Sequence, residues 1–260
     1  MAKSFLDGFF NLRDKIILVT GATGQLGFEI CNSYVKTGAK IIGTDKELNS
    51  SKMVKSDNIK YFEMDITDKK SIANIFERVN SSYGRFDILV NNAGVSAFEP
   101  FEDRPESSFD WVMDVNLKGT FLCIQTYING AKRKEQNGNI INIGSIYGVV
   151  SPDYRIYSDC ARRNSEVYGA TKAGIIQMTK YFAVHAAKYG IRVNCVSPGG
   201  IFNPENPQGK DFIKNYSDRC PMGRLASAEE IIGGILYLSS DAARYVTGQN
   251  LVIDGGMSCW

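Results

Sequence analysis

Short runs of apolar and β-branched residues alternate along the chain with longer segments in which apolar residues recur every three or four positions. The short runs have the length of buried β-strands, and the longer pattern is typical of helices that pack one face on a core. We expect strands at residues 16–20, 40–44, 60–64, 88–91, 139–143, 192–196 and 250–253.

Helical periodicity fills the intervals between these strands. Apolar residues at i, i+3, i+4 and i+7 mark residues 72–79, and Gly38 stands where a helix over 26–37 would need a C-cap. Further helices are expected at 115–131, 167–189 and 228–239. Such alternation predicts an α/β fold with a doubly wound, seven-stranded parallel sheet and helices on both faces. Ligands of such sheets bind beyond the carboxyl ends of the strands.

Composition narrows the classes of function. The 260 residues are 43% hydrophobic and 22% charged, which suits a single domain spanning residues 1–260. The net charge of +2 is spread without a dense basic stretch, so we expect no nucleic-acid partner. No apolar run is long enough for a membrane span and no signal-peptide core is visible, so we expect a soluble, cytoplasmic protein. Six scattered cysteines and one histidine, His185, argue against a bound metal.

A glycine-rich segment, TGATGQLG at residues 20–27, follows the first predicted strand and opens the first predicted helix. Gly21 allows a tight turn, Gly24 lets backbone approach a pyrophosphate, and Gly27 lets the helix pack against the sheet. The helix N-terminus then directs free N–H groups at the phosphates. A merely tight strand–helix turn would also use glycines, whereas a Walker loop would need a Gly-Lys-Ser/Thr sequence that is absent here.

Asp45, at the end of the second predicted strand, decides which dinucleotide the turn favours. A carboxylate there accepts hydrogen bonds from the ribose hydroxyls of NAD. The 2′-phosphate of NADP would face a like charge, which at ~4 Å and an effective dielectric of ~20 costs about 4 kcal/mol before screening. Lys46 could soften this repulsion, but no arginine stands in the glycine turn. We therefore predict NAD, with NADP disfavoured by Asp45.

The segment YGATK places Tyr168 and Lys172 four residues apart, on one face of a predicted helix. A lysine ammonium beside a phenol favours the phenolate and lowers the pKa of the tyrosine towards working pH. Such a tyrosine can exchange a proton with an alcohol or a carbonyl. A surface Tyr and Lys could show the same spacing, so the chemical interpretation depends on the glycine turn and on Ser145, which follows the strand at 139–143.

With these residues in place, the chain resembles the short-chain dehydrogenase/reductase family over roughly residues 15–256. The family's marks occur in order: TGATGQLG, Asp65 in EMDITD, NNAG at 91–94, Asn116 in VNLKGTF, Ser145 in NIGSIYG, YGATK, and PGG at 198–200. From Ser145 onward the chain is most similar to bacterial members of surface-glycan and flagellin-modification pathways. The resemblance implies a single Rossmann domain that assembles as a homodimer or homotetramer.

The resemblance also implies roles for individual residues. Tyr168 would be the catalytic acid/base, Lys172 would lower its pKa and bond the nicotinamide ribose, and Ser145 would hold the substrate oxygen. Asn116 would anchor a water for proton relay, although it could equally cap or bridge within a helix. NNAG could be only a tight strand end, and Asp65 only a helix cap. The implied cofactor contacts are Gly21, Thr23, Gly24, Gln25, Leu26, Gly27, Asp45, Asp65, Ile66, Asn92, Ala93, Gly94, Tyr168, Lys172, Pro198, Gly199 and Ile201.

Two departures from the family pattern bear on the site. Gln25 stands where single-domain members carry glycine, and Ser145 and Tyr168 are separated by more residues than in most members. Tyr157 is closer to the usual spacing but lacks a lysine four residues later. We therefore keep Tyr168 as the acid/base and treat residues 149–165 as an inserted loop. Residues 201–223, rich in Pro, Asn and Gly, are expected to form a substrate loop.

The inserted loop gives the sequence's main indication of the substrate. It carries Tyr154, Tyr157 and three arginines, Arg155, Arg162 and Arg163. Arginines suit phosphate or carboxylate groups and aromatics suit a sugar face, but the arginines could instead pair with Asp153, Asp159 and Glu166. We expect an NAD-dependent oxidoreductase that acts on a secondary alcohol or ketone of a sugar or sugar derivative in glycan biosynthesis. The alternatives are a reductase of 3-oxoacyl or other small carbonyl substrates, and a non-catalytic NAD-sensing protein.

Overall fold

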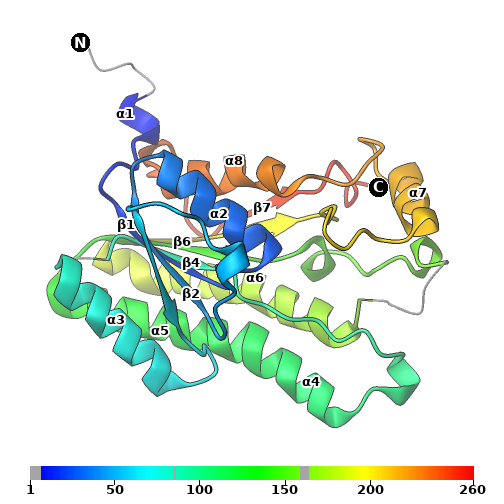
Figure 1. Cartoon of the computed structure of the whole chain (residues 1–260), viewed down its shortest axis with the longest axis horizontal. Helices are drawn as coiled ribbons and strands as arrows, with labels where there is room; N and C mark the ends of the chain where they lie inside the picture. Colours follow the sequence, from blue (N-terminus) through cyan, green and yellow to red (C-terminus); the bar gives the residue numbers. More distant parts are fainter. Residues whose placement is uncertain (1–6, 85, 159–163) are drawn as a thin grey trace.

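A computed structural model describes residues 7–84, 86–158 and 164–260 of the chain. Its described residues form one parallel sheet of seven strands in the order β3-β2-β1-β4-β5-β6-β7 (Figure 1). This confirms the doubly wound α/β fold predicted from the sequence. The strands are β1 Ile16–Thr20, β2 Lys40–Asp45, β3 Ile59–Glu63, β4 Ile88–Asn91, β5 Gly138–Ile143, β6 Ile191–Pro198 and β7 Asn250–Ile253.

The sheet separates two hydrophobic layers. Alternate residues of β1 point to opposite faces, so Leu18 joins the core under one set of helices and Val19 joins the core under the other. In Figure 1, α2 and α8 cover the upper face, and α3, α5 and α6 cover the lower face. The helices are α1 Asp7–Phe10, α2 Gln25–Lys36, α3 Lys69–Tyr83, α4 Glu106–Val112, α5 Thr120–Lys134, α6 Glu166–Ala186, α7 Lys210–Arg219 and α8 Ala228–Ser239.

The switch point of the sheet lies between β1 and β4. Leu18 pairs with Ile42 of β2 on one side and with Leu89 of β4 on the other. The chain runs outward from β1 to β3, returns to the centre at β4, and then runs outward to β7. The connections after β1 and β4 therefore diverge, which leaves a crevice beyond the carboxyl ends of these strands.

Most predicted elements agree with the structure to within a few residues, and two predictions need correction. The expected substrate loop at 201–223 contains a helix, α7 Lys210–Arg219, that buries Tyr216 against the protein. The expected helix at 115–131 is preceded by α4 and begins as a π-helix over Met113–Gly119. Gly38, with φ of 80°, follows the C-cap of α2 as the sequence indicated. No helix within the described residues is long and apolar enough to cross a membrane.

Candidate active site

A cleft of about 820 Å³ opens at the carboxyl ends of the central strands. Thr23 and Asn116 lie outside its lining, and all other residues that the sequence assigned to catalysis or cofactor binding line it. These are Gly21, Gly24, Gln25, Leu26, Gly27, Asp45, Asp65, Ile66, Asn92, Ala93, Gly94, Ser145, Tyr168, Lys172, Pro198, Gly199 and Ile201.

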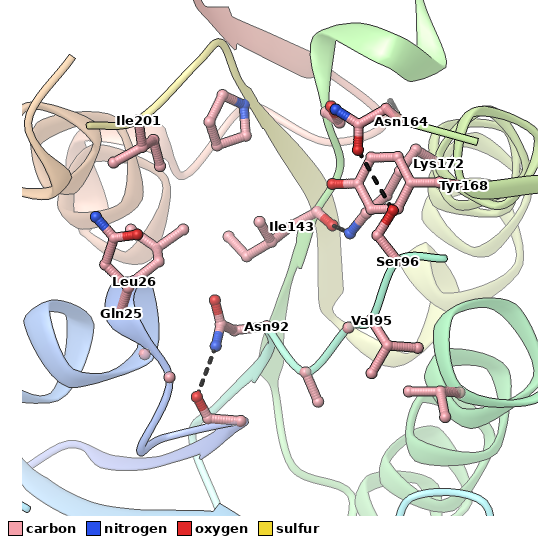
Figure 2. A pocket seen from close by; sticks show the side chains of 18 of the residues that line it. Gln25, Leu26, Asn92, Val95, Ser96, Ile143, Asn164, Tyr168, Lys172 and Ile201 are labelled. Carbon is pink, nitrogen blue, oxygen red and sulfur yellow. Dashed lines mark hydrogen bonds between the residues drawn. The ribbon is translucent and has the colours of Figure 1, made fainter. Parts of the chain in front are cut away.

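The glycine turn occupies one end of this cleft. An added Cβ on Gly27 would lie 1.9 Å from the carbonyl oxygen of Gly21, so only glycine lets α2 pack on the turn. Asn92 fixes the turn to the end of β4, because its Nδ2 donates to the carbonyl oxygens of Thr20 and Gly21, both at 3.0 Å. Figure 2 shows Asn92 in the cleft with one of these bonds drawn. The N-cap of α2, Gly24, provides no side-chain cap. The first N–H groups of α2 therefore remain suited to an anionic group in the cleft.

Thr23 orients the carboxylate of Asp45 at the cleft. The backbone N–H and the hydroxyl of Thr23 donate to Oδ2 of Asp45 at 3.1 and 2.7 Å. Thr23 thus orients the carboxylate, and its expected contact with the cofactor stays a prediction. Lys46, which also lines the cleft, forms an ion pair with Asp65, with Nζ and Oδ2 2.9 Å apart.

Asp65 is fixed in its ionised form at the same end of the cleft. Burial alone would raise its pKa, but hydrogen bonds from the backbone N–H and hydroxyl of Thr67, together with Lys46, outweigh burial and lower the pKa below its usual range. The carboxylates of Asp45 and Asp65 both line this end of the cleft.

Tyr168 and Lys172 project from α6 towards the cleft on the same side of the helix (Figure 2). Ser165 caps α6 by accepting the N–H of Tyr168 at 3.2 Å, which places Tyr168 in the first turn. The side chain of Lys172 is 4% exposed. Its Nζ donates to the carbonyl oxygen of Ile143 at 2.8 Å and lies 5.5 Å from the centre of the Tyr168 ring. The cation is therefore fixed beside the phenol.

Ser145 reaches the same part of the cleft from the end of β5. Its hydroxyl accepts the N–H of Tyr147 at 3.1 Å, which starts a 3-10 turn over Ile146–Gly148. This turn packs directly on α6, since an added Cβ on Gly148 would lie 2.7 Å from the backbone of Lys172. One contact between β5 and α6 thus sets the positions of Ser145, Tyr168 and Lys172 relative to each other.

Asn116 lies behind the cleft in the π-helical segment. Its Oδ1 accepts the N–H of Val95 and its Nδ2 donates to the carbonyl oxygen of Val95, both at 2.8 Å. Gly94 approaches this amide closely, because an added Cβ would lie 3.3 Å from Oδ1 of Asn116 and 3.6 Å from Nζ of Lys172. The side chain therefore bridges to the segment after β4 rather than within a helix, and its part in a proton relay stays a prediction.

The described arginine of the predicted insertion does not enter the cleft. Arg155 donates to Asp153 at 2.7 Å, and Arg219 lies 3.4 Å from the same carboxylate. These hydrogen bonds and charges lower the pKa of Asp153 to about 2. Arg162 and Arg163 fall outside the described residues. The structure thus supports surface ion pairing for Arg155, although Glu166 pairs with Arg104 rather than with an arginine of the insertion.

Several residues at the substrate end of the cleft were not named individually from the sequence. Tyr147 belongs to the NIGSIYG motif, and Phe212 and Tyr216 belong to the segment 201–223, which was expected to shape the substrate site as a loop. Their signal in the sequence was the aromatic spacing of residues 212–216, which is helical. The further lining residues are Ser96, Phe98, Trp111, Asn164 and Gln208.

Residues 201–208, which we name the strap, cross beside the glycine turn. Ile201 forms a β-bridge with Ala226 at the start of the strap. Gln25 Nε2 then donates to the carbonyl oxygen of Phe202 at 2.7 Å, and Lys52 pairs with Glu205 at 2.7 Å. The residue that departs from the family's glycine pattern therefore ties the strap to the first turn of α2.

Comparison with known proteins shows the family to which the chain belongs. The family model described as enoyl-(acyl carrier protein) reductase matches residues 21–258. The chain belongs to the short-chain dehydrogenase/reductase family. It is accordingly an oxidoreductase with a nicotinamide cofactor, and members of this family act on small molecules and are commonly oligomeric.

The alignments with individual relatives extend over nearly the whole length of this chain. A 3-oxoacyl-(acyl-carrier-protein) reductase of Thermotoga maritima is 35% identical, covering 95% of this chain and 98% of its own. An NAD-dependent glycerol dehydrogenase of Listeria innocua is 34% identical, covering 96% of both. A crystal structure of a short-chain dehydrogenase from Leptospira borgpetersenii with bound NAD⁺ is 46% identical, with a TM-score of 0.90 over 99% of this chain and 97% of that one. The expected likeness to glycan- and flagellin-modification enzymes is not confirmed by these relatives.

Proposed function

We propose that the protein is an NAD-dependent dehydrogenase that transfers a hydride between the nicotinamide and a carbon bearing a secondary hydroxyl or a carbonyl oxygen. The observation that carries this proposal is the convergence of Ser145, Tyr168 and Lys172 on the cleft that also contains the glycine turn. When bound, the nicotinamide supplies or accepts the hydride. The protein's own part is to hold the substrate oxygen and to move its proton.

Each catalytic side chain has a distinct part in oxidation of an alcohol. The hydroxyl of Ser145 donates a hydrogen bond to the substrate oxygen, and the phenolate of Tyr168 takes the hydroxyl proton as the hydride leaves carbon. The ammonium of Lys172, held by the carbonyl oxygen of Ile143, would stabilise the phenolate and would hold the nicotinamide ribose of a bound cofactor. In the reverse direction Tyr168 returns the proton to the carbonyl oxygen.

Asp45 supports NAD as the cofactor. The carboxylate faces the cleft and is oriented by two hydrogen bonds from Thr23, so it is placed to accept both ribose hydroxyls. The cation that could offset a 2′-phosphate, Lys46, is engaged with Asp65. A 2′-phosphate would therefore meet an uncompensated like charge.

For the substrate we propose an uncharged polyhydroxy compound, such as a sugar or sugar derivative of glycan biosynthesis. The substrate end of the cleft combines aromatic rings with neutral polar groups, and none of the described residues that line the cleft is an arginine. Gln208 adds an acceptor, because its Oε1 is buried and has no hydrogen-bond partner among the described residues. The name of the Listeria relative, a glycerol dehydrogenase, agrees with a polyol.

A second candidate is reduction of a 3-oxoacyl thioester, which the name of the Thermotoga relative favours. The two candidates are separated by one set of assays. Purified protein is offered glycerol, arabinitol and free hexoses with NAD or NADP, and acetoacetyl thioester with NADH or NADPH, while absorbance of the reduced nicotinamide is followed. We expect reduction of NAD by polyols. Turnover of the thioester alone would support the second candidate, and no turnover of any substrate would favour a non-catalytic NAD-sensing protein.

We also propose a homodimer or homotetramer. Large apolar side chains are exposed on the outer helices, with Trp111 of α4 and Tyr181 and Val184 of α6 among them. Assembly through α4, the π-helical segment and α6 would remove this apolar surface from water. A molar mass of one protomer by light scattering at micromolar concentration would contradict this assembly.

A further inference from the structure

A continuous row of neutral polar side chains lines the substrate end of the cleft. Ser96 donates to Oδ1 of Asn164 at 3.3 Å, Nδ2 of Asn164 donates to the hydroxyl of Tyr157 at 3.2 Å, and the hydroxyls of Tyr157 and Tyr147 are 3.0 Å apart. All four residues line the cleft. Figure 2 shows the bond between Ser96 and Asn164 beside Tyr168. We name these four residues the polar wall.

Each member of the polar wall is attached to the groups that carry the chemistry. Asn164 precedes Ser165, which caps the first turn of α6 and fixes Tyr168. Tyr147 donates its N–H to the hydroxyl of Ser145, and its own carbonyl oxygen would lie 3.0 Å from a Cβ added to Gly169. The wall is therefore adjacent to the reacting oxygen and has little freedom to move away from it.

Of the other two members, Ser96 enters from the segment after β4 and Tyr157 belongs to the predicted insertion. Ser96 follows Val95, whose backbone N–H and carbonyl are both bonded to Asn116. The row thus joins three separate parts of the chain, namely the end of β4, the end of β5 and the predicted insertion. Tyr157 is 7% exposed and packs its ring on Phe212 of α7, with the ring centres 5.2 Å apart.

We propose that the polar wall determines substrate specificity by binding hydroxyl groups on the carbons next to the one that exchanges hydride. The inference rests on the proposed function and adds the residues that select the substrate. An asparagine amide can make up to four hydrogen bonds. Asn164 bonds Ser96 and Tyr157 and also interacts with Tyr147, so a substrate hydroxyl can be added at the remaining lone pair of its Oδ1 without breaking the row. An alkyl group placed there would cover polar atoms without bonding them.

The protonation state of the wall suits this role. Burial, together with the neighbouring Tyr157 hydroxyl, raises the pKa of Tyr147 far above its ordinary value. Tyr147 is therefore a neutral phenol at neutral pH, and the wall presents hydroxyl and amide groups rather than charge. Such a surface favours a neutral polyol over a phosphate or a carboxylate.

The test compares two alcohols that share a three-carbon skeleton and a secondary hydroxyl. Glycerol has neighbouring hydroxyls and propan-2-ol has none, so the ratio of their kcat/KM values with NAD measures recognition of the extra hydroxyls. We expect Tyr157→Phe and Asn164→Leu to lower this ratio by about tenfold, mostly through the KM for glycerol, since each removes an uncharged hydrogen-bonding group. Turnover of propan-2-ol and the Kd for NADH should stay within about twofold.

Tyr154→Phe is the matched control. Like Tyr157→Phe, it removes a tyrosine hydroxyl from the predicted insertion. Tyr154, however, is 54% exposed and lies outside the cleft lining. The ratio should be unchanged in this variant. A parallel loss of both alcohols in Tyr157→Phe and Asn164→Leu would show a purely structural role and would overturn the inference, as would an unchanged ratio.

The proposed function and the inference fail in different ways. If the wild-type protein oxidises propan-2-ol at least as well as glycerol and arabinitol, hydride transfer stands and the polar wall does not select hydroxyls. If the wild-type protein oxidises no alcohol at all, the proposed function falls and the inference falls with it.

Discussion

At the scale of single residues, the position of Lys172 explains how three groups from distant parts of the sequence meet. Its Nζ is tied to the carbonyl oxygen of Ile143, the last residue of β5, and Ser145 follows two residues later. Tyr168 lies one turn before Lys172 on α6, so the bond between Lys172 and Ile143 also positions Tyr168. The lysine therefore fixes the distance between the serine and the tyrosine in addition to supplying charge.

Tyr168→Phe removes the proton-transferring hydroxyl and keeps the ring. We expect kcat to fall by about 10²–10⁴-fold, which is the usual contribution of a positioned acid/base. The Kd for NADH, measured by fluorescence, should change by less than about twofold, because the glycine turn and Asp45 are untouched. Tyr245→Phe, at a fully exposed position, serves as the control. Normal turnover in the Tyr168 variant would place the proton transfer on another group.

The sequence revealed residues whose spacing is itself the signal, such as Tyr168 with Lys172 or Gly21 with Gly27. It did not reveal contacts made through space. The hydroxyl of Thr23 donates to Asp45, and the amide of Asn116 bridges to Val95, and neither contact was predicted. Such roles depend on which strand ends are neighbours, and a local pattern carries no information on that.

At the scale of elements, the strap is held more by polar contacts than by packing. A hollow of about 660 Å³ lies behind it, lined by Phe28, Phe202 and Ile213 among others. The bonds from Gln25 and Lys52 therefore fix the strap beside the glycine turn, where it borders the cofactor end of the cleft. Departure of a bound dinucleotide should require these bonds to open.

We expect Gln25→Ala to increase the dissociation rate of NADH by about 2–10-fold, the equivalent of one neutral hydrogen bond. Stopped-flow fluorescence would measure this rate, and adding Lys52→Ala should increase it further. Lys214→Ala, which breaks an exposed pair with Asp218 on α7, is the control and should leave the rate unchanged. An unchanged rate in the double variant would show that the strap does not limit release.

Most elements could be predicted because their apolar residues repeat over many positions, as in α3, whose Ile72, Ile75, Phe76 and Val79 are all buried. Helix α7 was missed for a physical reason. It has ten residues and it follows a stretch rich in Pro, Asn and Gly. Its buried residue, Tyr216, finds its partners in the predicted insertion and in the turn at Gly200. Tertiary contacts stabilise this helix, and its own sequence signals it weakly.

At the scale of the whole molecule, the switch point of the sheet brings two halves of the chain to one ligand. Residues up to β4 supply the glycine turn, Asp45 and Asn92, whereas residues from β5 onward supply Ser145, Tyr168 and Lys172. A dinucleotide in this cleft contacts both halves and binds only when the sheet is complete. Binding should therefore stabilise the entire fold.

Thermal unfolding measures this coupling. NAD at about 100 times its Kd should stabilise the protein by about 2.7 kcal/mol, which for a chain of this size is a rise in Tm of about 5–10 °C. NADP at the same concentration should give a smaller rise because of Asp45. Asp45→Ala should narrow the difference between the cofactors, and Asp57→Ala, at an exposed position, should not. A larger rise with NADP in the wild-type protein would contradict the role given to Asp45.

The order of the strands has a consequence for the chain as it leaves the ribosome. The four strands from β3 to β4 are complete at Asn91, but their neighbour β5 begins only at Gly138. Throughout that interval of synthesis, β4 is an open, apolar edge in a nascent half-sheet, and such edges invite pairing with other chains. Helices α4 and α5 emerge in this interval, and α5 contributes to the core that covers β4 before β5 arrives to close the edge.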